Sequence, residues 1–259
     1  MSGNQTQDRV VGAERVLSVL AELAEHPSGI SLDDLTNRLN DPKPTVHRAL
    51  VSLKKFGFAT QVSRGVYTLG DEYLRLAFRN YADRPEGLRV EPLLRQLVEQ
   101  YGETAHYAVL DGADVVYRAK LDPPAGSVRL TSVVGGRNPA HRTAVGKMLL
   151  SFTIGSESEL RSWLGTSRLE PRTPHSITTV HQLWKELEAT RERGYAVDDQ
   201  ENEIGINCVA VPVRLDPALS PTGAVSVSAL AFRMPLAELI PEVPRIKELA
   251  QDILQNEAR

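Results

Sequence analysis

The chain has 259 residues, of which 41% are hydrophobic and 24% are charged, and its formal net charge is -3. This composition excludes a disordered or collagenous chain, and the length suits two domains of modest size better than one large fold. The single cysteine, Cys208, excludes an intramolecular disulfide and a Cys-x-x-Cys zinc site. The N-terminus is polar, and no apolar run approaches the roughly 18 to 20 residues of a membrane span, so we expect a cytoplasmic protein without a signal peptide or a membrane partner.

Charge is distributed unevenly along the chain. Between Asp41 and Val66 five basic residues stand against one acidic residue, a local net charge of +4 that leaves -7 for the remainder. A basic stretch within an acidic protein is typical of a separate nucleic-acid-binding module, although a solvated helix face also produces one.

Apolar residues at helical spacing predict three helices near the N-terminus. The first covers 16–24, the second begins at the N-cap Ser31, and the third follows a turn at 40–44. Two β-prone runs, 58–62 and 66–69, come next and are joined by a glycine-containing turn. Three helices followed by a hairpin is the order of a winged helix-turn-helix domain, which we place at 9–70.

The remainder predicts a linker helix at 71–86 and an α+β domain at 87–259, because helices and strands alternate irregularly there. The expected helices lie at 88–101, after Thr143, at 157–164, at 180–193 and through 246–253. The expected strands lie at 105–110, 115–121, 127–134, 195–198, 206–213 and 224–230.

The third helix carries polar residues opposite its apolar face. Arg48 can form two hydrogen bonds with a guanine edge, Thr45 and Ser52 can meet phosphates or bases, and Lys55 can neutralise a phosphate. Arg64 stands at the tip of the hairpin, or wing. The expected DNA contacts are Lys43, Pro44, Thr45, His47, Arg48, Ser52, Lys55 and Arg64. The alternative is that these side chains are only the solvated surface of a three-helix core.

Seven segments of the sequence resemble IclR-type transcriptional regulators, and the resemblance extends over about residues 10–255. They are residues 16–23, 30–32, 43–50, 67–70, 135–147, 194–201 and 205–213. The resemblance implies a winged helix-turn-helix that binds double-stranded operator DNA and a GAF-like α/β domain that binds a small metabolite. It also implies a homodimer that can pair into a tetramer, and a repressor more often than an activator.

The C-terminal part contains a candidate site for an organic acid. A helix that starts after Thr143 would direct the N–H groups of Ala144 and Val145 at a carboxylate. By strand alternation Ile206 shares a face with Cys208 and would limit ligand size, and Ser226 shares one with Ser228. The resemblance places Ala144, Val145, Asp198, Cys208, Ser226 and Ser228 around the effector. Alternatively, Cys208 is a small core residue, the serines bond to backbone and Asp198 caps the following loop.

Enzyme chemistry has little support in the sequence. Cys208, His141 and Asp198 are the residue types of a nucleophilic triad, but no motif places them together. There is no His-x-x-x-His pair and no glycine-rich phosphate loop, so we expect no catalytic residues, metal or cofactor. The remaining rivals are an enzyme with a C-terminal site and a sensor whose helical module binds protein instead of DNA.

Overall fold

The computed structural model describes residues 12–82, 86–124, 130–214 and 220–256. The chain separates into two units, Met1–Arg84 and Pro85–Arg259, and each is built around apolar core clusters of its own. Within the described ranges, no helix has the length and apolar character needed to cross a membrane.

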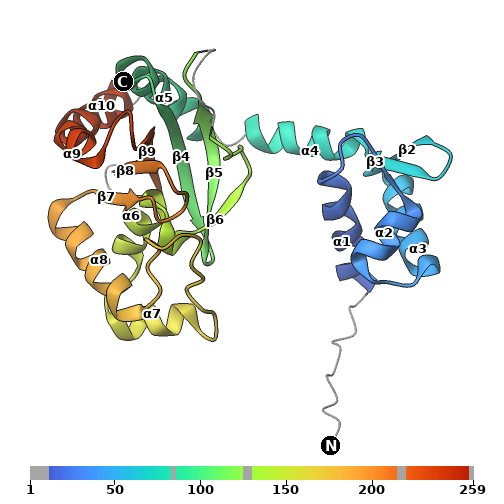
Figure 1. Cartoon of the computed structure of the whole chain (residues 1–259). Helices are drawn as coiled ribbons and strands as arrows, with labels where there is room; N and C mark the ends of the chain where they lie inside the picture. The colour runs from blue at the N-terminus through green and yellow to red at the C-terminus, as the bar shows by residue number, and fades with distance from the viewer. Residues whose placement is uncertain (1–11, 83–85, 125–129, 215–219, 257–259) are drawn as a thin grey trace, which may run out of the picture. The chain divides into compact units, whose positions relative to one another are not determined.

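The first unit is a three-helix core with a small sheet beside it (Figure 1). Its helices are α1 (Gly12–Ala24), α2 (Leu32–Leu39), α3 (Lys43–Lys55) and α4 (Asp71–Ala82), and its strands are β1 (Ile30–Ser31), β2 (Ala59–Ser63) and β3 (Val66–Leu69). The strands pair antiparallel in the order β1-β3-β2. This is the predicted winged helix-turn-helix, and the two-residue strand β1 is an element that the sequence did not predict.

Local chemistry sets the helix boundaries that orient α3. Ser31 Oγ accepts a hydrogen bond of 3.0 Å from the N–H of Asp34 and so caps α2, as predicted. Asn40 ends α2 in the left-handed conformation with φ of 51°, and Pro42 then opens α3. The turn is therefore tight, and α3 packs on α1 and α2 through one apolar face: Val46, Ala49, Leu50 and Leu53.

The second unit is a six-stranded antiparallel sheet in the order β6-β5-β4-β9-β8-β7. The strands are β4 (Thr104–Asp111), β5 (Asp114–Leu121), β6 (Arg137–Pro139), β7 (Ala196–Asp199), β8 (Ile206–Val213) and β9 (Gly223–Leu230). The helices are α5 (Glu86–Tyr101), α6 (Ala144–Thr153), α7 (Glu157–Leu164), α8 (Val180–Arg193), α9 (Leu236–Leu239) and α10 (Val243–Asn256), with 3-10 turns η1 (Ala140–Arg142) and η2 (Ile240–Glu242).

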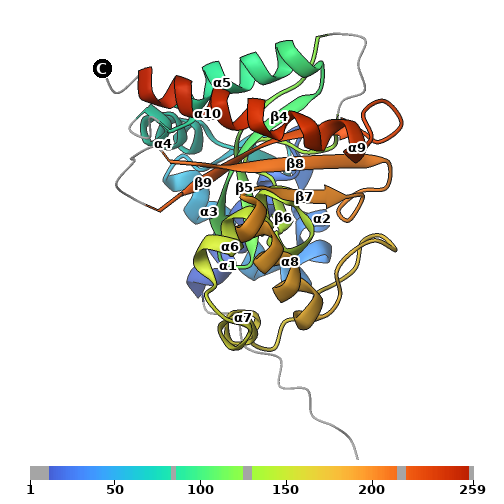
Figure 2. The ribbon, with the colours of Figure 1, turned by 90° about the vertical axis from the view of Figure 1, so that its left-hand side faces the viewer.

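Helices cover both faces of this sheet (Figure 2). Helices α5, α9 and α10 lie on one face, and α6 and α8, with α7 beside them, lie on the other. Strand β8 shows the alternation: Val209 and Val211 pack toward α5 and α10, whereas Cys208 and Ala210 face the α6 side. Cys208 and its neighbours on β9 are thereby directed to the face that α6 covers.

The expected strand at 127–134 is wrong. Residues 127–129 lie outside the described residues, and 130–134 form no strand. The carbonyl groups of Leu130 and Ser132 accept hydrogen bonds from Lys120 Nζ, at 3.0 and 2.7 Å, in place of partners in a sheet. The two valines that suggested a strand, Val133 and Val134, are 61% and 58% exposed. We call residues 130–136 the strap; the edge strand is the three-residue β6 that follows it.

Candidate functional sites

The exposed face of α3 carries most of the predicted DNA contacts. Pro44, His47, Arg48, Ser52 and Lys55 are all exposed, because the apolar positions between them are buried in the core. Thr45 is half-buried at the start of the helix, and its hydroxyl accepts a hydrogen bond of 3.5 Å from the Arg48 guanidinium. The face therefore presents a guanidinium, an imidazole, hydroxyls and an ammonium from one rigid helix.

Two lysines connect α3 to its neighbours. Lys43 forms an ion pair with Asp33 on α2, so its ammonium is partly neutralised before any DNA arrives. Lys54, which the sequence did not single out, bonds to Gln61 Oε1 on β2 at 3.0 Å and lies 5.7 Å from the centre of the Tyr67 ring on β3. Lys54 thus connects α3 to the wing, whose tip holds Arg64 in an exposed position before Gly65.

A cavity of about 170 Å³ opens between the α6 face of the sheet and the strap. All seven residues predicted to contact an effector line it: Ala144, Val145, Asp198, Ile206, Cys208, Ser226 and Ser228. They come from α6, β7, β8 and β9, so the structure brings together segments that are far apart in the sequence. Antiparallel pairing explains part of this, because Asp198 is opposite Cys208 and Cys208 is opposite Ser228.

The N-terminus of α6 forms one end of the cavity wall. Thr143 Oγ1 caps the helix by accepting from the N–H of Gly146 at 3.1 Å, and the Thr143 carbonyl accepts from that of Lys147 at 2.9 Å. The N–H groups of Ala144 and Val145 find no acceptor in the part of the chain that the structure describes. They form a pair of free donors at the positive end of a helix, which suits an anion.

Gly146 allows this helix start to sit where it does. A Cβ atom at this position would stand 2.2 Å from the carbonyl oxygen of Ala140 in η1, a distance that backbone atoms do not permit. The first turn of α6 therefore lies directly on η1, which fixes the direction of its free N–H groups.

The wall on the β4 and β5 side is polar and uncharged. His106, from β4, is 3% exposed, and burial, with the nearby Lys120 ammonium as a second cause, lowers its pKa to about 3. Burial likewise raises the pKa of Tyr117, on β5, to about 12, and the Tyr117 hydroxyl accepts from Asn138 Nδ2 at 3.2 Å. These groups offer hydrogen bonds and no net charge.

Asp198 lies in the cavity wall and also organises the loop that follows β7. Its Oδ1 accepts from the N–H groups of Glu201 and Asn202 at 2.7 and 3.3 Å, which is the loop cap that the sequence offered as an alternative. Burial raises the pKa of Asp198 to about 7, although the Lys147 ammonium opposes this. Asp198 thus caps the loop and also lines the cavity.

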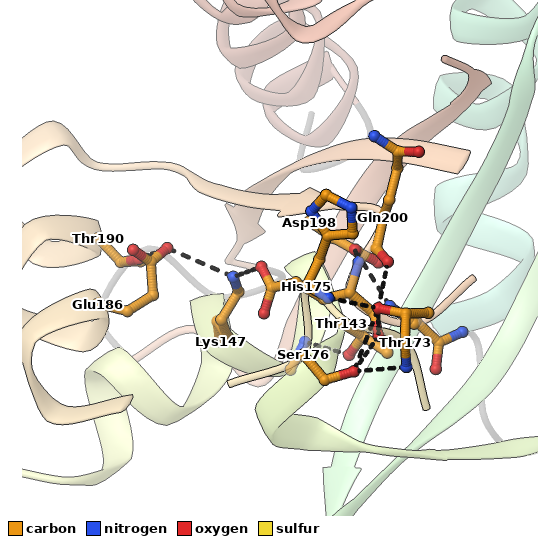
Figure 3. A network of polar contacts seen from close by, with 12 residues as sticks. Thr143, Lys147, Thr173, His175, Ser176, Glu186, Thr190, Asp198 and Gln200 are labelled. Atoms are coloured by element: carbon orange, nitrogen blue, oxygen red, sulfur yellow. Dashed lines mark hydrogen bonds and ion pairs between the residues drawn. The ribbon is translucent and has the colours of Figure 1, made fainter. Parts of the chain in front are cut away.

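A buried ion network holds this loop against α6 and α8 (Figure 3). Lys147, 1% exposed, pairs with Glu201 and lies 3.5 Å from Glu186 Oε1 on α8. From the other side, Thr173 Oγ1 donates to the carbonyl of Gln200 at 2.7 Å. Breaking one partner of such a buried pair leaves an uncompensated charge, so the network keeps the Asp198 loop in one position.

Several residues of the cavity escaped the sequence analysis. His106, Tyr117, Ser132, Asn138 and Thr143 all line it. Alternation along β4 would have placed His106 on one face, but nothing in the sequence says that β4 pairs with β9. The neighbours of His106 therefore became apparent only from the strand order.

The arrangement of Cys208 does not favour nucleophilic catalysis. Burial raises the pKa of its thiol well above the usual value, with the nearby Asp198 carboxylate as a further cause. His141 is not part of the cavity wall, and its Nε2 lies 3.4 Å from the carbonyl of Glu170. Among the described residues no group of three His, Cys, Asp or Glu side chains is placed to hold a metal ion.

Two family models match the chain. The model described as Bacterial transcriptional regulator IclR C-terminal matches residues 88–255, and the model described as IclR helix-turn-helix domain matches residues 12–63. Among curated proteins, the acetate operon repressor of Salmonella typhimurium is 30% identical over 230 residues, covering 87% of this chain and 82% of that protein.

Solved structures are similar in fold as well. The crystal structure of the Thermotoga maritima IclR is 29% identical, with a TM-score of 0.73, and the match covers 94% of this chain and 97% of that chain. The inducer-binding domain of the PobR transcription factor from Acinetobacter, a double mutant in complex with 3-hydroxybenzoic acid, is 26% identical. Its TM-score is 0.57, and the match covers 67% of this chain and 97% of that chain.

Proposed function

The chain belongs to the IclR family of bacterial transcriptional regulators, with a helix-turn-helix DNA-binding domain and a C-terminal effector domain. From this premise we propose that it is a repressor whose affinity for its operator falls when a small carboxylate binds in the cavity of the second unit. One observation carries the proposal: the free N–H groups of Ala144 and Val145 lie in the wall of a cavity whose other lining is polar and apolar and includes the Arg137 guanidinium and the Asp198 and Glu203 carboxyl groups.

Effector contacts come from the residues around this cavity. They are Ala144, Val145, Asp198, Ile206, Cys208, Ser226 and Ser228. The carboxylate accepts hydrogen bonds from the N-terminus of α6, and Ile206 limits the length of the ligand. Support comes from the PobR inducer-binding domain, whose ligand, 3-hydroxybenzoic acid, is itself a carboxylic acid.

In the complex with DNA, α3 enters the major groove, and the wing lies on the DNA backbone or in the minor groove. Arg48 reads a base, whereas Lys55 and Arg64 contact phosphates. The full set of proposed contacts is Lys43, Pro44, Thr45, His47, Arg48, Ser52, Lys55 and Arg64, all exposed except the half-buried Thr45.

The proposal includes an assembly and a location. We infer a cytoplasmic homodimer, able to pair into a tetramer, in which residues 71–86 link a DNA-binding domain at 9–70 to an effector domain at 87–259. Two-fold symmetry then requires a palindromic operator whose half-sites are separated by whole turns of the double helix. The protein is not an enzyme in this proposal, since its relatives are named as regulators and its buried thiol is not activated.

A fluorescence anisotropy titration on the DNA upstream of the protein's own gene tests the regulator. We expect salt-sensitive binding that a random duplex does not reproduce, and weaker binding when a carboxylate effector is added. The absence of sequence-selective binding there and at neighbouring promoters would refute it. If the effector instead tightened operator binding, the protein would still be a regulator, but the proposed release of the operator by the effector would be wrong.

A further inference from the structure

Both ring nitrogens of His106 are engaged by serine hydroxyls in the cavity wall. Nε2 lies 2.8 Å from Ser132 Oγ on the strap, and Nδ1 lies 3.3 Å from Ser228 Oγ on β9. All three residues line the cavity, and we call them the serine–histidine chain. The proposed function places the effector's carboxylate elsewhere, at the start of α6, so the chain is available to a second group of the ligand.

The neutral ring gives the two serines opposite roles. An uncharged imidazole carries one N–H and one bare nitrogen, so one serine accepts a hydrogen bond from His106 and the other donates one to it. The accepting serine keeps its O–H free, and the donating serine keeps its lone pairs free. Either tautomer gives this result, so the serine–histidine chain always offers one donor and one acceptor. The Cys208 thiol also interacts with Ser228, but a thiol is a weak hydrogen-bonding group and does not displace the imidazole.

A hydroxyl group is the complement of one donor and one acceptor, because it accepts and donates at once. A carboxylate or a ketone only accepts and an ammonium only donates, so each would match one of the two serines and leave the other without a partner on the ligand. The neutral ring carries no charge to offset a second negative charge on the ligand, and the Arg137 guanidinium in the cavity wall is already paired with Asp111. Selection therefore comes from the remaining hydrogen-bonding capacity of one serine, which the wrong ligand would leave unused.

Resting on the proposed function, we propose that the effector is a hydroxylated monocarboxylate, whose hydroxyl group is bound between Ser132 and Ser228 under the control of His106. Its size follows from the cavity of about 170 Å³. A cavity of about 150 Å³ accommodates benzene, so the ligand has the bulk of one substituted ring or of a short chain.

Calorimetric titration of the full-length protein with two matched series tests this. One series is benzoate, 3-hydroxybenzoate and 1,3-benzenedicarboxylate, and the other is butyrate, 4-hydroxybutyrate and succinate. In at least one series we expect the hydroxy acid to bind about tenfold more tightly than both other members, as two hydrogen bonds imply. If the hydroxy acid has no such advantage in either series, or if no acid binds, the inference is wrong.

Two variants assign the preference to the serine–histidine chain. Ser132→Ala acts at a half-buried position of the strap, and His106→Phe keeps a ring but removes both nitrogens. Each should bring the affinity for the hydroxy acid to within about threefold of that for the parent acid, without weakening the parent acid. Equal losses for both acids would overturn the assignment. Ser151→Ala is the control, since its hydroxyl bonds to the Met148 carbonyl within α6 and should leave the preference intact.

The two proposals fail in different ways. If acids bind and release the operator but show no preference for a hydroxyl group, the serine–histidine chain is not a selector and the regulator stands. If the operator binds and no acid has any effect, the carboxylate effector is wrong as well. Loss of sequence-selective DNA binding would refute the regulator alone, because the calorimetric titration does not involve DNA.

Discussion

Arg48 is the residue on which sequence-selective binding should depend most. It is exposed on α3, and its only hydrogen bond among the described residues is the long one to Thr45, so its guanidinium is free to pair with a guanine edge. We expect Arg48→Ala to cost about 1 to 3 kcal/mol on the operator and much less on random DNA. Lys55→Ala is the comparison and should weaken both by the same factor. If Arg48→Ala weakened the affinity for both duplexes equally, measured by anisotropy, Arg48 would contact the DNA backbone and not a base.

Asp198 should make the stability of the second unit depend on pH. Its pKa of about 7 in the folded protein lies above the unfolded value, so the folded state binds the proton more tightly and the free energy of unfolding falls as pH rises from about 4 to about 7. Asp198→Asn keeps an oxygen for the Glu201 and Asn202 N–H groups but removes the charge. We expect the variant to gain about 1 kcal/mol or more relative to the original protein between pH 5 and pH 8 in urea unfolding.

Glu201 is also buried and its pKa is raised as well, so it contributes a background that both proteins share. Asp199→Asn, at the exposed neighbouring position, is the control and should reproduce the pH profile of the original protein. A constant difference between Asp198→Asn and the original protein across this range would mean that Asp198 stays ionised when folded.

At the residue level, the sequence predicted the cavity residues on β7 and β8 but missed those on β4 and the strap. Ile206 and Cys208 were placed together by strand alternation, and the family resemblance supplied Asp198. His106 and Ser132 were missed because their contacts join segments 26 and 122 positions apart, through the strap and through the pairing of β4 with β9. Periodicity indicates which face a side chain occupies but gives no information about the residues that face it.

The start of α6 is the element whose position matters most for the cavity. Gly146→Ala raises helix propensity by about 1 kcal/mol, but its Cβ would meet the Ala140 backbone at 2.2 Å. We expect a net loss of about 2 kcal/mol, because η1 and α6 must move apart. Trp163 and Trp184 both lie in the second unit, so tryptophan fluorescence during urea unfolding reports on that unit.

Gly155→Ala is the matched control in the same unit. Its Cβ would stand 3.3 Å from a Glu159 carboxylate oxygen, which can swing away, so we expect a change smaller than about 1 kcal/mol. Equal losses from the two substitutions would mean that the contact between α6 and η1 is not tight in solution.

Elements were predictable where one apolar face meets one core. Helix α3 shows this, since its buried residues recur at three and four positions and its boundaries follow from a capped turn. The strap shows the opposite case: its valines are exposed and its carbonyl groups bond to the side chain of Lys120, an interaction with no period in the sequence. Strand β6 escaped because three residues carry no pattern.

For the whole molecule, net charge is the least informative quantity. A value of -3 combines a basic segment at α3 and the wing with an acidic remainder. Each unit has its own core and its own proposed ligand, DNA for the first and an acid for the second. Regulation then requires a coupling free energy between two sites that share no residues.

That coupling must be reciprocal, so its sign can be measured from the side of either ligand. If the acid weakens operator binding by some factor, the operator must weaken acid binding by the same factor, because both routes connect the same states. We expect the tightest acid of the two series to bind several-fold more weakly when the protein is saturated with operator, measured by calorimetry, and unchanged with a random duplex. Tighter acid binding on the operator would mean that the effector promotes DNA binding, and the proposed repression would then be exercised by the liganded protein.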